Sequence, residues 1–455
     1  MKRQQSATFA RDRLNQKEMR EAMKAAFYTL GCKVNQYEAE VLSKQFEKEG
    51  FTIVSPEEPA DVYVVNSCTV TATGDKKTKQ ILRHFRRLNG NAVIALTGCF
   101  PQAFPEEAAR IQEADIVMGA RNRNQLIGEV KKVLENRSRI VCIAPHEAGE
   151  AFESMSAEAF AEHTRAFVKI EDGCDRWCTY CIIPKARGPI RSKPLEQLRT
   201  ELETLTQNGY REIVLVGINL SSYGKETGYA VRLADAVELA CSLPGVKRVR
   251  LGSLEPELMS DEDVDRLAAL EKFCPQFHLS LQSGCGATLK RMNRHYTPEE
   301  YARLTEKIRA RFDMPSVTTD IMVGFPGETS EEFEESVEFA KRIGFAKAHV
   351  FAYSPRKGTR AAEMEHQVPK PEKERRSRIM MEAADETRAA FWESQKGQVH
   401  EVLFETLRED GTTIGYTKNY TPVIVRSEAD IRGEIFPVEI QGTAADGCVG
   451  TIIHH

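Results

Sequence analysis

Short apolar runs alternate with amphipathic stretches along the first part of the chain. The apolar runs cover residues 26–30, 62–65, 93–96 and 116–118. Between and after them, residues 38–48, 76–88, 106–113 and 124–134 place apolar side chains at a spacing near 3.6 residues. Strands that alternate with helices in this way predict a parallel sheet with helices on its faces.

The same alternation continues on a larger scale between residues 164 and 360. Candidate strands cover residues 166–170, 212–216, 248–252, 277–281, 317–323 and 346–351. Helical patterns separate them, for example over residues 195–208, 261–270, 298–311 and 330–343. Six βα units over roughly 200 residues predict an incomplete (β/α) barrel, because a complete barrel has about eight units over about 250 residues. An open doubly wound sheet is the alternative that the pattern leaves open.

Three other segments of the chain depart from this alternation of strands and helices. A Glu-rich stretch after residue 141 has little periodicity and is predicted to be a solvated linker; it contains Glu147, Glu150, Glu153, Glu158 and Glu162. Residues 363–388 are dense in charge and predict a helical connector. Five short alternating runs follow, over 399–404, 412–417, 423–426, 435–440 and 449–453. They predict a small antiparallel barrel of a kind often used to bind RNA.

Composition agrees with a folded protein of about three domains. The chain has 455 residues, of which 41% are hydrophobic and 29% charged, and its mean hydropathy is −0.43. No apolar run is long enough for a membrane span, and the polar start MKRQQSATFARDRLNQ is not a signal peptide, so we expect a cytoplasmic protein.

The formal net charge of −4 does not indicate a nucleic-acid partner, but two local windows are basic. Both windows could neutralise phosphates. The first comprises Lys76, Lys77, Lys79, Arg83, Arg86 and Arg87, and the second Lys185, Arg187, Arg191 and Lys193.

Three cysteines lie close together directly after the first strand of the central segment. Cys174, Cys178 and Cys181 (the second trio) form C-x3-C-x2-C in GCDRWCTYC. Part of this motif could be a redox dithiol or half of a zinc site, but no closing ligand pair lies at zinc-ribbon distance. Three thiolates at this spacing can instead hold three irons of a [4Fe–4S] cube and leave the fourth iron open.

Three further cysteines each follow a predicted strand of the first segment. Cys32, Cys68 and Cys99 (the first trio) end the runs FYTLGC, VYVVNSC and AVIALTGC. Because ligands gather at the carboxyl ends of parallel strands, these thiols could converge in space. Three separately buried cysteines are the alternative. We expect burial for the remaining cysteines, which are Cys142, Cys241, Cys274, Cys285 and Cys448; a site role is the alternative for Cys285, which lies in LSLQSGC at the end of a predicted strand.

The second trio resembles the cluster motif of the radical S-adenosylmethionine (SAM) enzymes, and the whole chain resembles the methylthiotransferases among them. TLGCKVNQYE, NSCTV, TGC, GCDRWCTYCIIPKARG and a terminal small barrel occur in the order of that family. LVGINLSSYG, LSLQSGC, DIMVGFPGE and FAYSPRKGT match as well. On these motifs we expect contacts to the cofactor from Tyr180, Gly217, Asn219, Gln282 and Asp320.

The resemblance implies an α/β architecture of three domains. These are an N-terminal parallel α/β methylthiotransferase domain over residues 22–145, a partial (β/α)6 radical SAM core over 160–390 and a TRAM RNA-binding domain over 393–455. It also implies two [4Fe–4S] clusters, one on each cysteine trio, together with SAM. The open iron of the second cluster would bind SAM, which one electron cleaves to a 5′-deoxyadenosyl radical, and the first cluster would carry or donate the inserted sulfur.

Members of this family differ in their targets, and TLGCKVNQYE is most similar to the members that act on threonylcarbamoyladenosine beside the anticodon of tRNA. Isopentenyladenosine in tRNA and an aspartate of a ribosomal protein are the alternatives. The expected partners are the tRNA anticodon loop, an electron donor such as flavodoxin or ferredoxin, and a sulfur source.

Two other classes stay open on the sequence. One is a non-catalytic iron–sulfur protein that binds RNA, and the other is an unrelated radical SAM enzyme whose auxiliary cluster relays electrons. A nucleotide triphosphatase or a hydrolase is unsupported, since the chain lacks G-x4-G-K-[ST], H-E-x-x-H and G-x-S-x-G.

Overall fold

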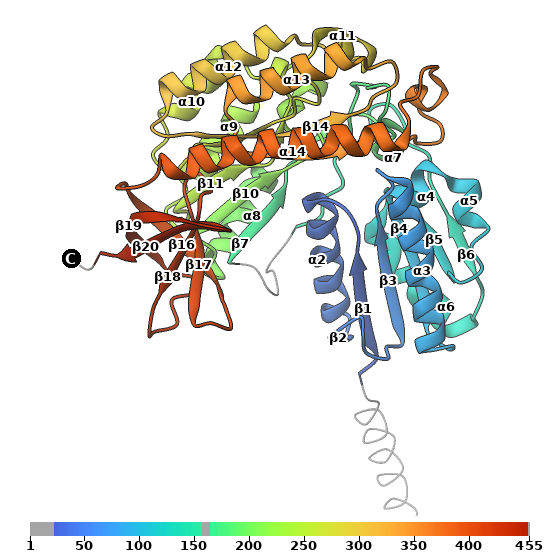
Figure 1. Ribbon diagram of the computed structural model, residues 1–455. Coiled ribbons are helices and arrows are strands. Elements are labelled where there is room, and N and C mark those ends of the chain that lie inside the picture. The colour runs from blue at the N-terminus through green and yellow to red at the C-terminus, as the bar shows by residue number, and fades with distance from the viewer. Residues whose placement is uncertain (1–21, 157–163, 454–455) are drawn as a thin grey trace, which may run out of the picture.

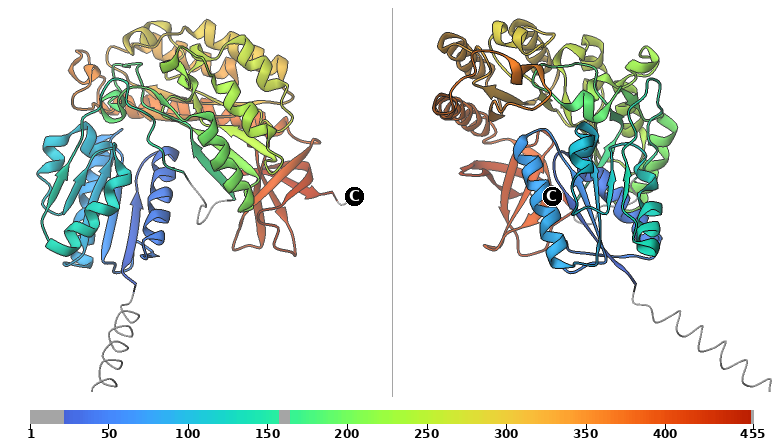
Figure 2. Two further views of the ribbon diagram at one scale, coloured as in Figure 1. Left: turned by 180° about the vertical axis from the view of Figure 1, so that it is seen from behind. Right: turned by 90° about the vertical axis from the view of Figure 1, so that its right-hand side faces the viewer.

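The computed structural model describes residues 22–156 and 164–453, which form three domains in chain order (Figure 1). The amino-terminal domain and the small carboxyl-terminal barrel both lie on one side of the larger central domain (Figures 1 and 2). The polar start of the chain, Glu158 and Glu162 fall outside the described residues. Within the described ranges, no helix combines the length and the apolar composition that crossing a membrane requires.

The amino-terminal domain is a six-stranded parallel sheet in the order β2-β1-β3-β4-β5-β6. The strands are β1 (Lys24–Thr29), β2 (Thr52–Val54), β3 (Val62–Ser67), β4 (Val93–Gly98), β5 (Ile116–Met118) and β6 (Ile140–Cys142). The helices are α2 (Lys33–Lys48), α3 (Ala72–Leu88), α4 (Cys99–Ala103), α5 (Pro105–Ala109) and α6 (Leu126–Asn136). The predicted parallel sheet is confirmed, while β2, β6 and α4 are too short to give a clear pattern.

The centre of this sheet is covered by helices on both faces. Val62 and Val64 of β3 pack into one hydrophobic core, and the intervening Tyr63 and Val65 pack into another. This burial of both faces explains why β3 reads as a continuous apolar run. The core that contains Val62 and Val64 continues into the central domain, where α2 packs against β7.

The central domain is an incomplete barrel of parallel strands. The barrel strands are β7 (Arg165–Lys169), β10 (Glu212–Val216), β11 (Arg248–Leu251), β12 (Ser253–Leu254), β13 (Gln276–Leu279), β14 (Ser316–Val323) and β15 (Lys347–Ala352). β8 (Glu171–Asp172) and β9 (Arg191–Ser192) form a separate antiparallel pair. One sheet has the order β11-β10-β7 and another β12-β13-β14-β15, and a single bridge between Val249 and Phe273 joins them. β7 and β15 are therefore the two outer strands, and the predicted partial barrel is confirmed over an open doubly wound sheet.

Helices cover the outside of this partial barrel. They are α7 (Ile183–Arg187), α8 (Leu195–Gln207), α9 (Leu233–Ser242), α10 (Asp261–Ala268), α11 (Gly286–Arg291), α12 (Pro298–Arg311), α13 (Ser330–Ile343) and α14 (Lys370–Glu393). Short 3-10 turns occur at η1 (Arg123–Gln125), η2 (Leu220–Ser222), η3 (Lys225–Thr227), η4 (Pro256–Leu258) and η5 (Arg360–Glu363). The sequence pattern gives the bounds of α12 and α13 correctly, because capping boxes begin both helices at Thr297 and Thr329.

The carboxyl-terminal domain is a closed five-stranded barrel in the order β16-β17-β18-β20-β19. Its strands are β16 (Val399–Leu407), β17 (Thr412–Thr417), β18 (Pro422–Arg426), β19 (Ile435–Ala444) and β20 (Gly447–Ile452). The predicted small barrel is confirmed, although β18 and β20 pair in parallel rather than antiparallel. Two buried arginines of β11 fasten it to the central domain: Arg248 donates to the Glu401 carbonyl at 2.7 Å and Arg250 to the Lys418 carbonyl at 2.9 Å.

The prediction of a solvated Glu-rich linker is confirmed at Glu147, which is exposed, and is wrong at Glu150 and Glu153. Glu150 is buried and its carboxylate pairs with Arg121 at 3.0 Å and also with Arg191. Glu153 pairs with the buried guanidinium of Arg123 at 3.3 Å. The linker supplies counter-charges to buried arginines, which cannot stay unpaired in a protein interior.

Candidate functional site

The first cysteine trio meets at the carboxyl edge of the amino-terminal sheet. Cys32 is the N-cap of α2 after β1, Cys68 follows β3, and Cys99 begins α4 after β4. β1, β3 and β4 are neighbours in the sheet, so the three loops lie side by side. The structure thus brings together three cysteines that are far apart in the sequence.

Close backbone approach makes this convergence possible. Gly31 has a φ of +110°, and a Cβ atom there would lie 2.8 Å from the Cβ of Cys68, so only glycine fits. Cys99 is 3% exposed whereas Cys32 is exposed. Burial raises the pKa of the Cys99 thiol to about 12, with Arg187 opposing the shift and the thiols of Cys68 and Cys32 adding to it. The three thiols are therefore electrostatic neighbours.

The second trio lies on the loop between β8 and α7. The backbone N–H of Cys174 donates to the Gly188 carbonyl at 3.0 Å, which closes the loop. Arg294 donates to the Cys178 sulfur at 3.3 Å. Burial raises the pKa of both Cys174 and Cys181 to about 12, and each thiol is raised further by its neighbours in the trio. Cluster binding at either trio would therefore release protons, because ligating thiols are deprotonated.

The donor sets fit iron–sulfur clusters. Among the described residues, no three His, Cys, Asp or Glu side chains are close enough together to hold a single metal ion. A [4Fe–4S] cube binds each thiolate to a different iron, so its ligands stand farther apart than the ligands of one ion. The first trio offers three soft sulfur donors on adjoining loops and the second offers three on one loop, which is the chemistry such a cube requires.

One open cavity of about 650 Å³ connects the first trio with the interior of the partial barrel. Cys32 and Lys33 line it from the amino-terminal domain, and Tyr420 lines it from the carboxyl-terminal barrel. Further lining residues come from the start of α2 and from β10 to β15 with their adjoining loops, including Gln276 and Lys347 at the amino ends of β13 and β15. This volume is within the range of small-molecule sites and draws on all three domains.

The residues expected to contact the cofactor are spread around this region. Gly217 and Asp320 line the cavity. The Asn219 amide points to the Cys174 sulfur at 4.0 Å. Gln282 exchanges backbone hydrogen bonds with β14 and has a φ of +67°. The ring of Tyr180 packs edge-on against Phe325 with centroids 6.4 Å apart, and burial raises the pKa of Tyr180 well above its usual value.

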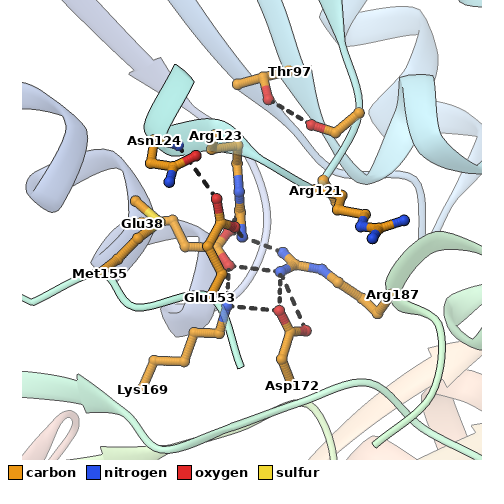
Figure 3. Close-up of polar contacts among 12 residues, drawn as sticks. Glu38, Thr97, Arg121, Arg123, Asn124, Glu153, Met155, Lys169, Asp172 and Arg187 are labelled. Atoms are coloured by element: carbon orange, nitrogen blue, oxygen red, sulfur yellow. Dashed lines mark hydrogen bonds and ion pairs between the residues drawn. The ribbon is translucent and has the colours of Figure 1, made fainter. Parts of the chain in front are cut away.

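A buried network of charges joins the amino-terminal and central domains (Figure 3). Glu38 of α2 is fully buried and pairs with Arg187 at 2.6 Å, with Lys169 at 2.8 Å and with Arg123. Burial opposes ionisation of Glu38, but Arg123 and Arg187 hold its pKa well below the usual range. Arg187 also donates from Nε to the Cys99 sulfur at 3.1 Å.

The sequence pattern did not single out these residues for this role. Glu38 closes the motif TLGCKVNQYE, and Arg187 belongs to the second basic window. Each has other polar residues around it in the sequence, so the local pattern did not indicate that the two side chains pair. Glu171 was missed as well. It is fully buried, accepts from the Asn219 N–H at 2.7 Å, and its Oε1 atom has no partner. Burial raises the pKa of Glu171 well above its usual value.

The second basic window does not form a phosphate-binding surface, so that prediction is wrong. Arg187, Arg191 and Lys193 are buried, and the ammonium of Lys193 pairs with Glu201. Lys185 is exposed but donates to the Gly358 carbonyl at 2.7 Å. These residues stabilise the domain interface, and a charge run alone could not reveal their counter-charges in a distant segment.

Within the part of the chain that the structure describes, only some of the first basic window, on α3, is free of ion pairs and could still neutralise phosphates. Lys79, Arg83 and Arg86 form ion pairs with Glu107, Glu113 and Asp115. Lys76 and Lys77 are exposed. Of the remaining cysteines, Cys241, Cys274, Cys285 and Cys448 are buried as expected, and Cys142 is half-buried on β6.

Family models match the three domains in order. The amino-terminal domain matches the uncharacterized protein family UPF0004 over residues 24–119. The central domain matches the radical SAM superfamily over residues 168–340, and the carboxyl-terminal barrel matches the TRAM domain over residues 393–445.

Two kinds of relative resemble the chain over nearly its whole length. It is 39% identical to the threonylcarbamoyladenosine tRNA methylthiotransferase MtaB of Bacillus subtilis (91% of this chain, 93% of the relative) and 38% identical to MtaB of Thermotoga maritima (92% and 95%). It is 34% identical to the tRNA-2-methylthio-N(6)-dimethylallyladenosine synthase of Pelotomaculum thermopropionicum (93% and 96%). In fold it resembles the radical SAM methyltransferase TsrM of Kitasatospora setae, with a TM-score of 0.57 at 16% identity over 75% of this chain and 74% of TsrM.

Proposed function

Because the chain belongs to the methylthiotransferase family of radical SAM enzymes, we propose that it methylthiolates C2 of N6-threonylcarbamoyladenosine next to the anticodon of tRNA. The observation that carries the proposal is the single cavity that reaches from Cys32 to the inside of the radical SAM barrel. The cavity is lined by Cys32 of the first trio and by Gly217, two positions before Asn219, whose amide lies 4.0 Å from the Cys174 sulfur, so a base in it would lie between the two trios. The substrate follows the MtaB relatives, which are more similar to this chain than the dimethylallyladenosine synthase of Pelotomaculum thermopropionicum.

We further propose that the two trios hold two [4Fe–4S] clusters, one on Cys32, Cys68 and Cys99 and the other on Cys174, Cys178 and Cys181. When bound, the second cluster supplies one electron to cleave SAM to a 5′-deoxyadenosyl radical, and the first supplies sulfur. Radical chemistry is required because the C2–H bond of adenine has no acidic proton and carbon 2 has no leaving group.

The protein's own part is to position the reactants and exclude water. Asn219 and Arg294 approach the sulfurs of Cys174 and Cys178 and would orient the second trio. Arg187 would do the same for Cys99. Gly217 leaves room beside the buried Glu171, because a Cβ at Gly217 would lie 2.6 Å from the Glu171 carboxyl oxygen. SAM is expected to bind between Gly217 and the second trio.

The tRNA would dock across the carboxyl-terminal barrel and α3, with the single-stranded anticodon loop entering the cavity. Reduction by a flavodoxin- or ferredoxin-type donor and a separate sulfur source complete the proposal. The non-catalytic alternative has no use for a cavity that reaches from Cys32 into the partial barrel, and the electron-relay alternative gives no reason for an RNA-binding barrel.

The test offers anaerobically reconstituted enzyme three substrates: tRNA with threonylcarbamoyladenosine, tRNA with isopentenyladenosine, and the ribosomal protein. Mass spectrometry of the products should show a methylthio group on the first substrate alone. Product from the isopentenyl substrate alone would refute the substrate while leaving the reaction class intact. Product from the ribosomal protein alone would refute the tRNA assignment. Cys285→Ala serves as the control variant, since Cys285 lies outside both trios.

A further inference from the structure

The cavity that reaches from Cys32 into the partial barrel carries an excess of positive charge. Asp320 is the one acidic residue among those that line it, and it already pairs with His278 at 3.4 Å. Lys33 and Lys347 line the same cavity. A ligand group that balances this charge would be an anion.

Most cations near the cavity already have partners. Arg165 pairs with Glu405 at 2.7 Å, and Arg250 pairs with Glu212 at 3.0 Å while donating to backbone carbonyls of the carboxyl-terminal barrel. The charges of these arginines are therefore already compensated by carboxylates.

Lys33 and Lys347 differ from them, because neither forms a hydrogen bond or an ion pair within the described residues. Lys33 is the first residue of α2, and its ammonium lies 5.7 Å from the centre of the Phe167 ring. Lys347 is the first residue of β15 and is exposed to the cavity. Both lysines act on the charge of His349, which lies two positions after Lys347 on the same face of β15. The two ammonium groups therefore approach the same region from different domains.

The position of Lys347 separates this region from the second trio. Lys347 lies at the amino end of β15, whereas the second trio follows the carboxyl ends of β7 and β8. Since the strands of the barrel are parallel, Lys347 lies at the opposite end of the barrel strands from the second trio and lines the cavity together with Tyr420. An anion held there belongs to the part of the substrate that is far from the second trio.

We propose that Lys33 and Lys347 form a carboxylate subsite that binds the threonyl carboxylate of the modified adenosine and selects it over an apolar isopentenyl group. The inference rests on the proposed function and deepens it. An isopentenyl group would leave two ammonium groups in the cavity without a counter-charge, whereas a carboxylate pairs with both.

The test compares wild type, Lys33→Met and Lys347→Met on two RNAs, one with threonylcarbamoyladenosine and one in which the threonyl carboxylate is a carboxamide. The wild type should act on the acid with a kcat/KM about 10- to 100-fold higher than on the amide, the range of a charge-assisted hydrogen bond. Each variant should lose most of that advantage on the acid and change little on the amide. Affinity for the two RNAs, measured by fluorescence anisotropy, should follow the same pattern.

One control variant and two further comparisons show which anion the lysines bind. Lys247→Met removes an exposed lysine outside the cavity and should behave as wild type. SAM cleavage without RNA should be unchanged in both variants; a loss there would assign the lysines to the carboxylate of SAM and overturn the proposal. An equal loss on acid and amide would assign them to a phosphate and overturn it as well.

The failures are distinguishable from a failure of the proposed function. If the threonylcarbamoyl RNA is no substrate at all, the proposed function fails. If it is a substrate but the wild type treats acid and amide alike, only the carboxylate subsite fails. Because Lys33 is next to Cys32, iron content and the visible spectrum of Lys33→Met are compared with those of Lys347→Met, which is remote from both trios in sequence.

Discussion

Replacing Arg187 by Met should destabilise the protein far more than replacing an arginine on the surface. The Arg187 guanidinium is fully buried and contacts Glu38 at 2.6 Å, Asp172 at 3.5 Å and the Cys99 sulfur at 3.1 Å. Removing one partner of a buried ion pair leaves the other charge without full compensation, which costs about 3–5 kcal/mol. Glu38 and Asp172 each keep an ion pair with Lys169, so the lower end of that range, about 3 kcal/mol, is expected.

A loss of about 3 kcal/mol corresponds to a fall of roughly 6–12 °C in the unfolding temperature of a domain of 150–250 residues. Differential scanning calorimetry of the cluster-free protein measures it. Arg83→Met is the matched control: Arg83 pairs with Glu113 at 3.1 Å but its side chain is 63% exposed, so the loss there should stay below about 1 kcal/mol. Equal shifts in the two variants would refute the reasoning from burial.

The double variant Arg187→Met with Glu38→Gln tests whether the effect is electrostatic. If the cost of Arg187→Met is uncompensated charge, the double variant should be less destabilised than the sum of the two single variants, by about 1–3 kcal/mol. Strict additivity would show instead that lost packing of the guanidinium accounts for the change.

Four further outcomes are expected. Anaerobic reconstitution should give about eight irons per chain, and about four after the second trio is replaced by alanine; saturation of the wild type at four irons would contradict the two-cluster proposal. Cys68→Ala should still cleave SAM to 5′-deoxyadenosine but form no methylthio product, as followed by liquid chromatography. Glu171→Gln should flatten the pH dependence of stability, because the pKa of Glu171 is raised in the folded protein. The stability that protonated Glu171 contributes is complete below the unfolded pKa of about 4.3 and falls by up to about 1.4 kcal/mol per pH unit above it. Calorimetry repeated between pH 5 and 8 should therefore show the unfolding temperatures of wild type and variant diverging. Changing Lys76 and Lys77 to alanine should reduce the salt dependence of tRNA binding, by about one in the slope for each phosphate that is no longer neutralised, and an unchanged slope would exclude α3 from the interface.

The architecture was predictable because its signals are local. The alternation of apolar runs and helical patterns indicated the parallel sheet, the partial barrel and the terminal barrel, and the strand-end positions of Cys32, Cys68 and Cys99 indicated that they would meet at one edge. Hydrophobic periodicity shows which face of a helix or strand is buried. In a parallel sheet all strands end at the same edge, so residues that directly follow different strands lie near one another.

The charged residues were not predictable in the same way. Arg187 and Lys193 have the composition of an RNA-binding window, yet their counter-charges, Glu38 and Glu201, lie in other parts of the chain. Glu150 looked like a solvated linker residue for the same reason. Whether a charge faces water or a buried partner depends on the packing of domains, and one-dimensional patterns carry no information about that packing.

The domain interface and the cavity depend on each other. The partial barrel ends at β7, and α2 of the amino-terminal domain packs against that strand, so the Cys32 end of α2 is placed at the cavity only when the domains are docked. The charges of Glu38, Lys169 and Arg187 are desolvated by the same docking and are compensated only by one another and by neighbouring charges of the same interface. Any change in domain orientation would expose unpaired buried charges, which makes one orientation strongly preferred. The network therefore fixes the distance between the two cysteine trios, and a reaction that joins sulfur to a carbon radical requires that this distance be set before the substrate enters.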